Sequence, residues 1–114
     1  MKESELLLEI RKLSVGDTRL FRNNVGLAQD ARGNFTTYGL CVGSADLIGW
    51  RSWVVRPRDV GTEIAVFTAI ECKGTHGILS KEQRAFLQAV QKAGGFAGVA
   101  YEVVDARLIL RLDD

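Results

Sequence analysis

The stretch EIAVFTAIECK, residues 63–73, decides the fold of this chain. From Ile64 to Ile70 both alternating sets of positions are mostly apolar, so both faces of the segment are apolar. Such a pattern is typical of a central strand that is covered on both sides. The pattern ends in Glu71 and Lys73, which strand alternation places on the same face. The stretch therefore predicts a buried strand that ends in a carboxylate and an ammonium group.

After this strand, the spacing of apolar residues predicts a helix over residues 80–93. Leu87 and Val90 belong to its apolar stripe, and a pair of glycines closes the segment. A second buried strand is expected over residues 96–104. The tail from Asp105 suits either a strand, through its alternating leucines, or a short helix.

The part of the chain before residue 63 is more polar, and we expect shorter elements there. They are a helix over residues 4–13, a strand over 19–23, a loop over 24–39, strand material over 40–42 and 45–50, and a basic connection over 51–62. The resulting order is α-β-β-β-α-β with a tail. It predicts a single α/β domain over residues 1–114, with a sheet flanked by helices.

Length and composition exclude several classes of protein. The chain has 114 residues, of which 46% are hydrophobic and 25% charged, and this excludes disordered, collagen-like and disulfide-scaffold proteins. The formal net charge of +1 gives no bulk field for nucleic acid, so any positive surface must be local. The acidic N-terminus and the short apolar runs predict neither export nor a membrane span, and we expect two reduced cysteines.

Three charged residues do not fit a core. Glu71 and Lys73 alone are typical of a strand that surfaces with a solvated ion pair. Asp46 adds a carboxylate within apolar strand material, and if its strand pairs beside the Glu71 strand, all three converge. Two neighbouring carboxylates repel unless a cation lies between them, and oxygen ligands favour Mg²⁺ or Mn²⁺. A lysine there can orient or deprotonate water, or offset charge on a phosphate, as metal-assisted phosphodiester hydrolysis requires.

The predicted helix over residues 80–93 has two polar features, each with two interpretations. Gln83 lies within the apolar stripe, and Ser80 to Gln83 fits a capping box, so Gln83 is a cap, a functional residue, or both. On another face Lys81 and Arg84 recur at helical spacing with Gln88 and Lys92. This stripe indicates either a solvated face or a contact with a phosphate backbone.

Polar residues near the N-terminus are further candidates. Arg22 and Asn23 follow the predicted strand and indicate phosphate contacts, positioning of the metal ligands, or an ordinary turn. Glu5 and Glu9 lie one turn apart on the first predicted helix, where such residues are usually solvent-facing, and one of them is a candidate metal ligand. His76 has no partner at metal-ligand spacing, and we assign it no role.

Five blocks of the sequence carry a resemblance to a known family. They lie in order at residues 3–5, 19–26, 43–47, 70–73 and 79–87. Together they resemble a stand-alone VRR-NUC domain, the virus-type replication-repair nuclease branch of the PD-(D/E)XK superfamily, over about residues 3–104. The resemblance implies a restriction-endonuclease-like core, in which a mixed sheet has helices on its faces.

The resemblance also implies roles for individual residues. Asp46 and Glu71 would hold Mg²⁺ or Mn²⁺, Lys73 would activate water, and Gln83 matches a glutamine that follows the E-x-K motif in this family. The N-terminal acidic metal ligand falls on Glu5, with Glu9 as the alternative.

Stand-alone phage and bacterial members resemble homodimeric Holliday junction resolvases, whereas a eukaryotic relative acts on flaps. We therefore expect a cytoplasmic enzyme of a bacterial or phage-infected cell that acts on branched DNA, a four-way junction or a flap. It is expected to form a homodimer, because two symmetric sites suit a four-way junction. Neither a membrane nor an organic cofactor is expected. A nuclease-like DNA-binding module without turnover is the alternative from another functional class.

Overall fold

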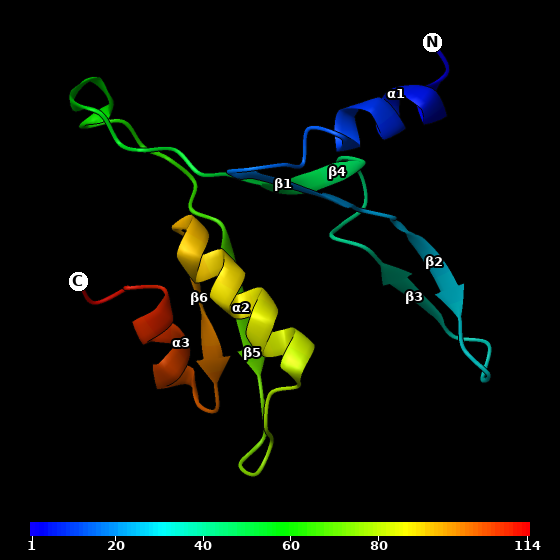
Figure 1. The fold of residues 1–114 in the computed structure, drawn as a ribbon. Coiled ribbons are helices and arrows are strands. Elements are labelled where there is room, and N and C mark those ends of the chain that lie inside the picture. The colour runs from blue at the N-terminus through cyan, green and yellow to red at the C-terminus, as the bar shows by residue number, and fades with distance from the viewer. The chain divides into compact units, whose positions relative to one another are not determined.

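The computed structural model describes residues 1–114, which form three α-helices, six strands and one 3₁₀ helix. In chain order they are α1 (Glu3–Arg11), β1 (Thr18–Arg22), β2 (Gly26–Gln29), β3 (Phe35–Tyr38), β4 (Leu47–Arg51), η1 (Pro57–Asp59), β5 (Thr68–Cys72), α2 (Lys81–Ala93), β6 (Phe96–Ala100) and α3 (Val103–Ile109) (Figure 1). The chain divides into two units, Met1–Arg51 and Ser52–Asp114, and each is described by itself. No helix is long and apolar enough to cross a membrane.

The first unit pairs β1 with β4 in an antiparallel ladder that runs from Thr18↔Arg51 to Arg22↔Leu47. A glycine makes one close approach in this ladder possible. Gly49 lies opposite Leu20, and a Cβ at Gly49 would collide with the backbone carbonyl of Arg19. No residue of α1 or β1 is fully buried.

The loop expected over residues 24–39 is instead a hairpin, in which β2 pairs antiparallel with β3. Asp30 builds its turn: its Oδ1 accepts hydrogen bonds from the backbone N–H groups of Arg32 and Asn34, both at 2.9 Å. Gly33 supplies the positive φ of +84° that the turn needs. The prediction failed because the strands are too short and too polar to show clear alternation, whereas the turn residues dominate the composition.

The second unit is built on β5 and β6, which pair in parallel from Thr68↔Phe96 to Cys72↔Ala100. Gln83 of α2 contacts Glu71 on β5, whereas Ile109 of α3 lies against Gly98, the register partner of Ile70. Adjacent strand residues point to opposite faces, so α2 and α3 cover opposite faces of the pair. Parallel strands require such a crossover, and α2 provides it.

The buried side chains all belong to this second unit. They are Leu87, Val90 and Ala100, with relative exposures of 7%, 1% and 7%. The helix that carries the first two begins at the expected capping box of Ser80 and ends before Gly94, which has a φ of +102°. The sequence prediction of this helix is therefore confirmed, including its cap.

Several predicted boundaries were wrong. The strand expected over residues 63–73 is shorter, Thr68–Cys72, and is only half-buried, because its only pairing partner is β6. Residues 40–42 form no strand, and residues 103–109 form α3, capped by Asp105, whose Oδ2 accepts from the backbone N–H of Tyr101 at 2.8 Å. The strands form three two-stranded sheets, so the α/β class is confirmed in small sheets.

Candidate active site

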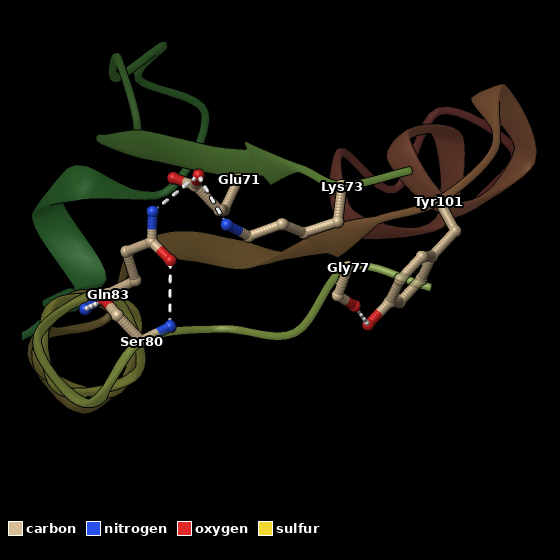
Figure 2. Close-up of polar contacts among 6 residues, drawn as sticks. All are labelled: Glu71, Lys73, Gly77, Ser80, Gln83 and Tyr101. Atoms are coloured by element: carbon tan, nitrogen blue, oxygen red, sulfur yellow. Dashed lines mark hydrogen bonds and ion pairs between the residues drawn. The ribbon is translucent and has the colours of Figure 1, made fainter. Parts of the chain in front are cut away.

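The end of β5 carries the acidic and basic side chains of the E-x-K motif. Lys73 Nζ lies 3.8 Å from Glu71 Oε1, and the two side chains are 21% and 35% exposed. Both point to the same face, as strand alternation predicts (Figure 2). The backbone N–H of Lys73 donates to the carbonyl of Ala100 at 3.0 Å, one step beyond the β5–β6 ladder. The lysine is therefore anchored through its backbone to the neighbouring strand.

Gln83 joins the cap of helix α2 to the carboxylate of Glu71. Its Oε1 accepts from the Ser80 backbone N–H at 2.9 Å, and its own backbone N–H donates to Ser80 Oγ at 3.0 Å. The other end of the same amide, Nε2, donates to Glu71 Oε1 at 2.9 Å (Figure 2). The two interpretations of Gln83 from the sequence are thus compatible: one side chain caps the helix and contacts the candidate active site.

A short loop after β5 lies against the stem of Lys73. A Cβ at Gly77 would be 3.1 Å from Lys73 Cβ and 3.2 Å from Lys73 Cδ, so a larger residue there would have to displace the lysine stem by a few tenths of an ångström. The hydroxyl of Tyr101, just after β6, donates to the Gly77 carbonyl at 3.1 Å (Figure 2). The loop and the tyrosine together restrict where the lysine stem can lie.

Asp46 belongs to the first unit, directly before β4. Its side chain is 60% exposed, and Oδ1 lies 3.4 Å from Arg22 Nη1. Convergence of Asp46 with Glu71 and Lys73 through the sheet depends on its strand pairing beside that of Glu71, whereas in the structure β4 pairs with β1 and β5 pairs with β6. The apolar residues of β4 gave no signal for its partner, because alternation describes a strand's faces and not its neighbours.

Asn23, a candidate for DNA contact, is engaged within the first unit. Its Nδ2 donates to Ser44 Oγ at 2.7 Å and to the Ala45 carbonyl at 2.9 Å. Its Oδ1 accepts from the Leu40 backbone N–H at 3.0 Å. Arg22, the other candidate beside it, has the ion pair with Asp46.

The remaining candidates lie on exposed helix faces. Glu5 and Glu9 are both exposed on α1, and Glu9 Oε1 forms an ion pair with Lys12 Nζ at 2.8 Å. Lys81 and Arg84 are exposed on α2, as their helical spacing predicts. Within the first unit, neither glutamate forms an ion pair or hydrogen bond with Asp46, and within the second unit neither Lys81 nor Arg84 forms one with Glu71.

The carboxylates present suit a hard divalent cation. Neither unit brings together three or more His, Cys, Asp or Glu side chains. Mg²⁺, however, retains several waters and is commonly held through one or two carboxylates. Gln83 Nε2 and Lys73 Nζ both contact Oε1 of Glu71, which leaves Oε2 open, and Asp46 is well exposed. The donor chemistry therefore fits Mg²⁺ or Mn²⁺.

Three residues that position the candidates were not singled out from the sequence. Tyr101 and Gly77 are separated by 24 positions, and Ser44 lies 21 positions from Asn23. A tyrosine at a strand end and glycines in a loop are too common to indicate such contacts. Only the location of Gly77 six residues after Glu71 and of Ser44 two before Asp46 offered a signal.

Comparison with protein families gives one match. The sequence profile of the VRR-NUC domain matches residues 11–104, which is most of the chain and spans both units. No curated protein and no solved structure matches the chain.

Proposed function

The chain belongs to the VRR-NUC domain family of nucleases, which have a PD-(D/E)XK-type fold, and from this premise we propose that it is a structure-selective DNA endonuclease that resolves four-way junctions. Nucleases of this family generally use divalent metal ions, and DNA is the substrate that the domain implies. The observation that carries the proposal is the environment of Glu71. Its Oε1 lies 2.9 Å from Gln83 Nε2 and 3.8 Å from Lys73 Nζ.

In the proposed reaction, water attacks the phosphorus atom and one bridging P–O bond breaks. Asp46 and Glu71 supply the carboxylates that hold Mg²⁺ or Mn²⁺, with Glu5, or alternatively Glu9, as a further acidic ligand. When bound, the metal supplies Lewis-acid stabilisation of the phosphate. Lys73 activates the attacking water by orienting it and offsets the charge that builds on the phosphate oxygens.

Gln83 supports this chemistry by holding Glu71. A carboxylate that ligates a metal works best when another group fixes its orientation, and the Gln83 amide supplies that hydrogen bond. Lys81 and Arg84 on α2, together with Arg22, are proposed to contact DNA phosphates. The positive charge would then be local, in agreement with the net charge of only +1.

The preference for a four-way junction rests on symmetry. A homodimer with two-fold symmetry presents two identical sites, and a junction offers two equivalent strands for paired cuts. A flap or nicking nuclease uses the same chemistry on one strand. A non-catalytic DNA-binding module retains the fold without turnover.

The test is cleavage of a synthetic four-way junction, with linear duplex and flap DNA as controls. Wild type, Lys73→Ala and the matched control Lys2→Ala are compared with Mg²⁺, with Mn²⁺ and with chelator. The proposal expects paired, metal-dependent cuts by wild type and Lys2→Ala and none by Lys73→Ala. Cleavage confined to flap DNA would exclude the four-way junction as the substrate but would leave the proposed reaction unchanged. Junction binding without cleavage under either metal would favour the non-catalytic module.

The oligomeric state requires its own measurement. Sedimentation of the protein, alone and with an uncleaved junction in Ca²⁺, is expected to give two protomers per junction. A single protomer bound to each junction would overturn the dimer while leaving the active-site residues unaffected.

A further inference from the structure

The loop that precedes Asp46 is a built structure within the first unit. Residues 41–44 form a turn, in which the Ser44 backbone N–H donates to the Cys41 carbonyl at 3.0 Å. Ser44 Oγ donates to the same carbonyl at 2.6 Å. Gly43 has a φ of +86°, as the third residue of a type II turn requires.

Asn23, directly after β1, holds this turn through its side chain. Its side chain can form four hydrogen bonds, and it forms three, all with residues 40–45. One is to Ser44 Oγ, which also bonds the turn itself, so the amide and the turn form a connected network. Nearby, a Cβ at Gly39 would collide with the carbonyl of Asn24, so the loop lies directly against this part of the chain.

Asn23 also fixes the backbone of Asp46 itself. Its N–H donates to the Asp46 carbonyl at 2.8 Å, which extends the β1–β4 ladder one step beyond the Arg22↔Leu47 pair. The residue that carries the exposed carboxylate is thus held on both of its sides: through this bond, and through the bond from Asn23 Nδ2 to the preceding Ala45 carbonyl. The first unit has no buried side chain, so these hydrogen bonds hold Asp46 without the support of a packed core.

We infer that Asn23 is a positioning residue for the metal-binding carboxylate of Asp46, acting through the loop of residues 40–45. This inference rests on the proposed function, because it takes Asp46 as a metal ligand. Of the alternatives that the sequence left for Asn23, it selects the positioning of a metal ligand over contact with DNA. An amide with all its donors engaged by the loop has none left for a phosphate, because the two Nδ2 hydrogens account for both bonds.

Direct Mn²⁺ binding to the protein without DNA tests the inference by calorimetry, with no turnover required. Asn23→Ala is expected to weaken Mn²⁺ binding about 10- to 100-fold, as loss of groups that orient a ligand typically does. Asn24→Ala removes the neighbouring asparagine, whose side chain does not bond the loop, and is expected to bind Mn²⁺ as wild type does. Ser44→Ala removes one of the three contacts and is expected to give a smaller loss.

The affinity for a four-way junction without divalent metal separates positioning from DNA contact. The inference expects Asn23→Ala to bind the junction within about twofold of wild type, with an unchanged salt dependence. Weaker junction binding with unchanged Mn²⁺ binding would overturn it and return Asn23 to the DNA interface. If circular dichroism shows that Asn23→Ala is unfolded, Ser44→Ala takes its place as the test. Mn²⁺ binding by Ser44→Ala equal to that of wild type would then overturn the inference.

A double-mutant cycle shows whether the effect of Asn23 passes through Asp46. In the Asp46→Ala background, Asn23→Ala is expected to cause no further loss of Mn²⁺ binding. A full additional loss would overturn the inference. If wild type neither cleaves DNA nor binds Mn²⁺, the proposed function itself fails. If wild type cleaves and Asp46→Ala does not, normal Mn²⁺ binding by Asn23→Ala overturns the positioning role alone.

Discussion

The two units hold their candidate carboxylates in different ways. Glu71, in the second unit, lies on a parallel strand covered by helices, and it receives a side-chain hydrogen bond from Gln83 at 2.9 Å. Asp46, in the first unit, lies at the end of an antiparallel ladder with no buried residue around it, and polar contacts from Asn23 fix its loop. The difference teaches that a carboxylate can be positioned by a side chain from a packed helix or by hydrogen bonds that hold its loop. The two carboxylates should therefore respond to different substitutions.

The largest expected effect treats the two carboxylates alike. Asp46→Asn and Glu71→Gln are each expected to lower the cleavage rate by about 10³-fold, equivalent to about 4 kcal/mol, because each removes the charge of a carboxylate that is proposed to bind the metal. Single-turnover cleavage at saturating protein measures this. Full activity of Asp46→Asn would show that the Asp46 carboxylate takes no part in cleavage. The comparison between the two carboxylates would then no longer hold.

The next effect separates the units by stability. Leu87→Ala is expected to lower the free energy of unfolding by about 2–3 kcal/mol, because it removes a buried side chain from the second unit. Leu8→Ala on α1, where the side chain is 59% exposed, is the matched control and is expected to change it by less than about 0.5 kcal/mol. Urea denaturation measures both. An equal loss of stability for Leu8→Ala would show that Leu8 is buried in solution, in a core that the first unit acquires when protein molecules assemble.

A third substitution separates the two roles of Gln83. Gln83→Glu retains the capping box with Ser80 but places a second carboxylate against Glu71, so it is expected to lower cleavage about 10-fold or more without loss of helix stability. Gln83→Ala removes both contacts and is expected to cost about 1 kcal/mol in stability as well. Equal cleavage by wild type and Gln83→Glu would reduce Gln83 to a helix cap.

The smallest expected effect concerns the ion pair of the first unit. In the proposed site, Arg22 competes with the metal ion for the Asp46 carboxylate, and the pair is exposed, with side-chain exposures of 38% and 60%. Such pairs contribute at most about 1 kcal/mol, so Arg22→Gln is expected to strengthen Mn²⁺ binding by no more than about fivefold, and less at high salt. Weaker Mn²⁺ binding would mean that Arg22 helps to orient Asp46.

The sequence predicted best where one strong local pattern was enough. The α2 helix has its cap residue, its apolar stripe and its closing glycines within one continuous segment. The cap, the closing glycines and the burial of Leu87 and Val90 were confirmed, whereas Phe86, also expected on the core-facing stripe, is 40% exposed. The E-x-K side chains shared a face as alternation requires. Local rules of this kind depend only on neighbours along the chain.

Features that depend on distant partners could not be predicted. The contact of Tyr101 with Gly77 and that of Asn23 with Ser44 join residues more than 20 positions apart, and no spacing rule indicates them. The β2–β3 hairpin was missed because its polar strands are stabilised mainly by the turn at Asp30. The family profile supplied what these local patterns lack, since it joins blocks from residue 11 to residue 104.

The parallel pairing of β5 with β6 has a consequence for how the protein is made. Lys73 is anchored by a hydrogen bond to the carbonyl of Ala100, and α2 occupies the stretch between them. A chain emerging from the ribosome therefore exposes its E-x-K motif well before that motif can pair, whereas the β2–β3 hairpin can close as soon as it appears. Under the proposed function, cleavage of DNA begins only after synthesis has passed residue 100, and ribosome-bound fragments that end earlier do not cut nearby DNA.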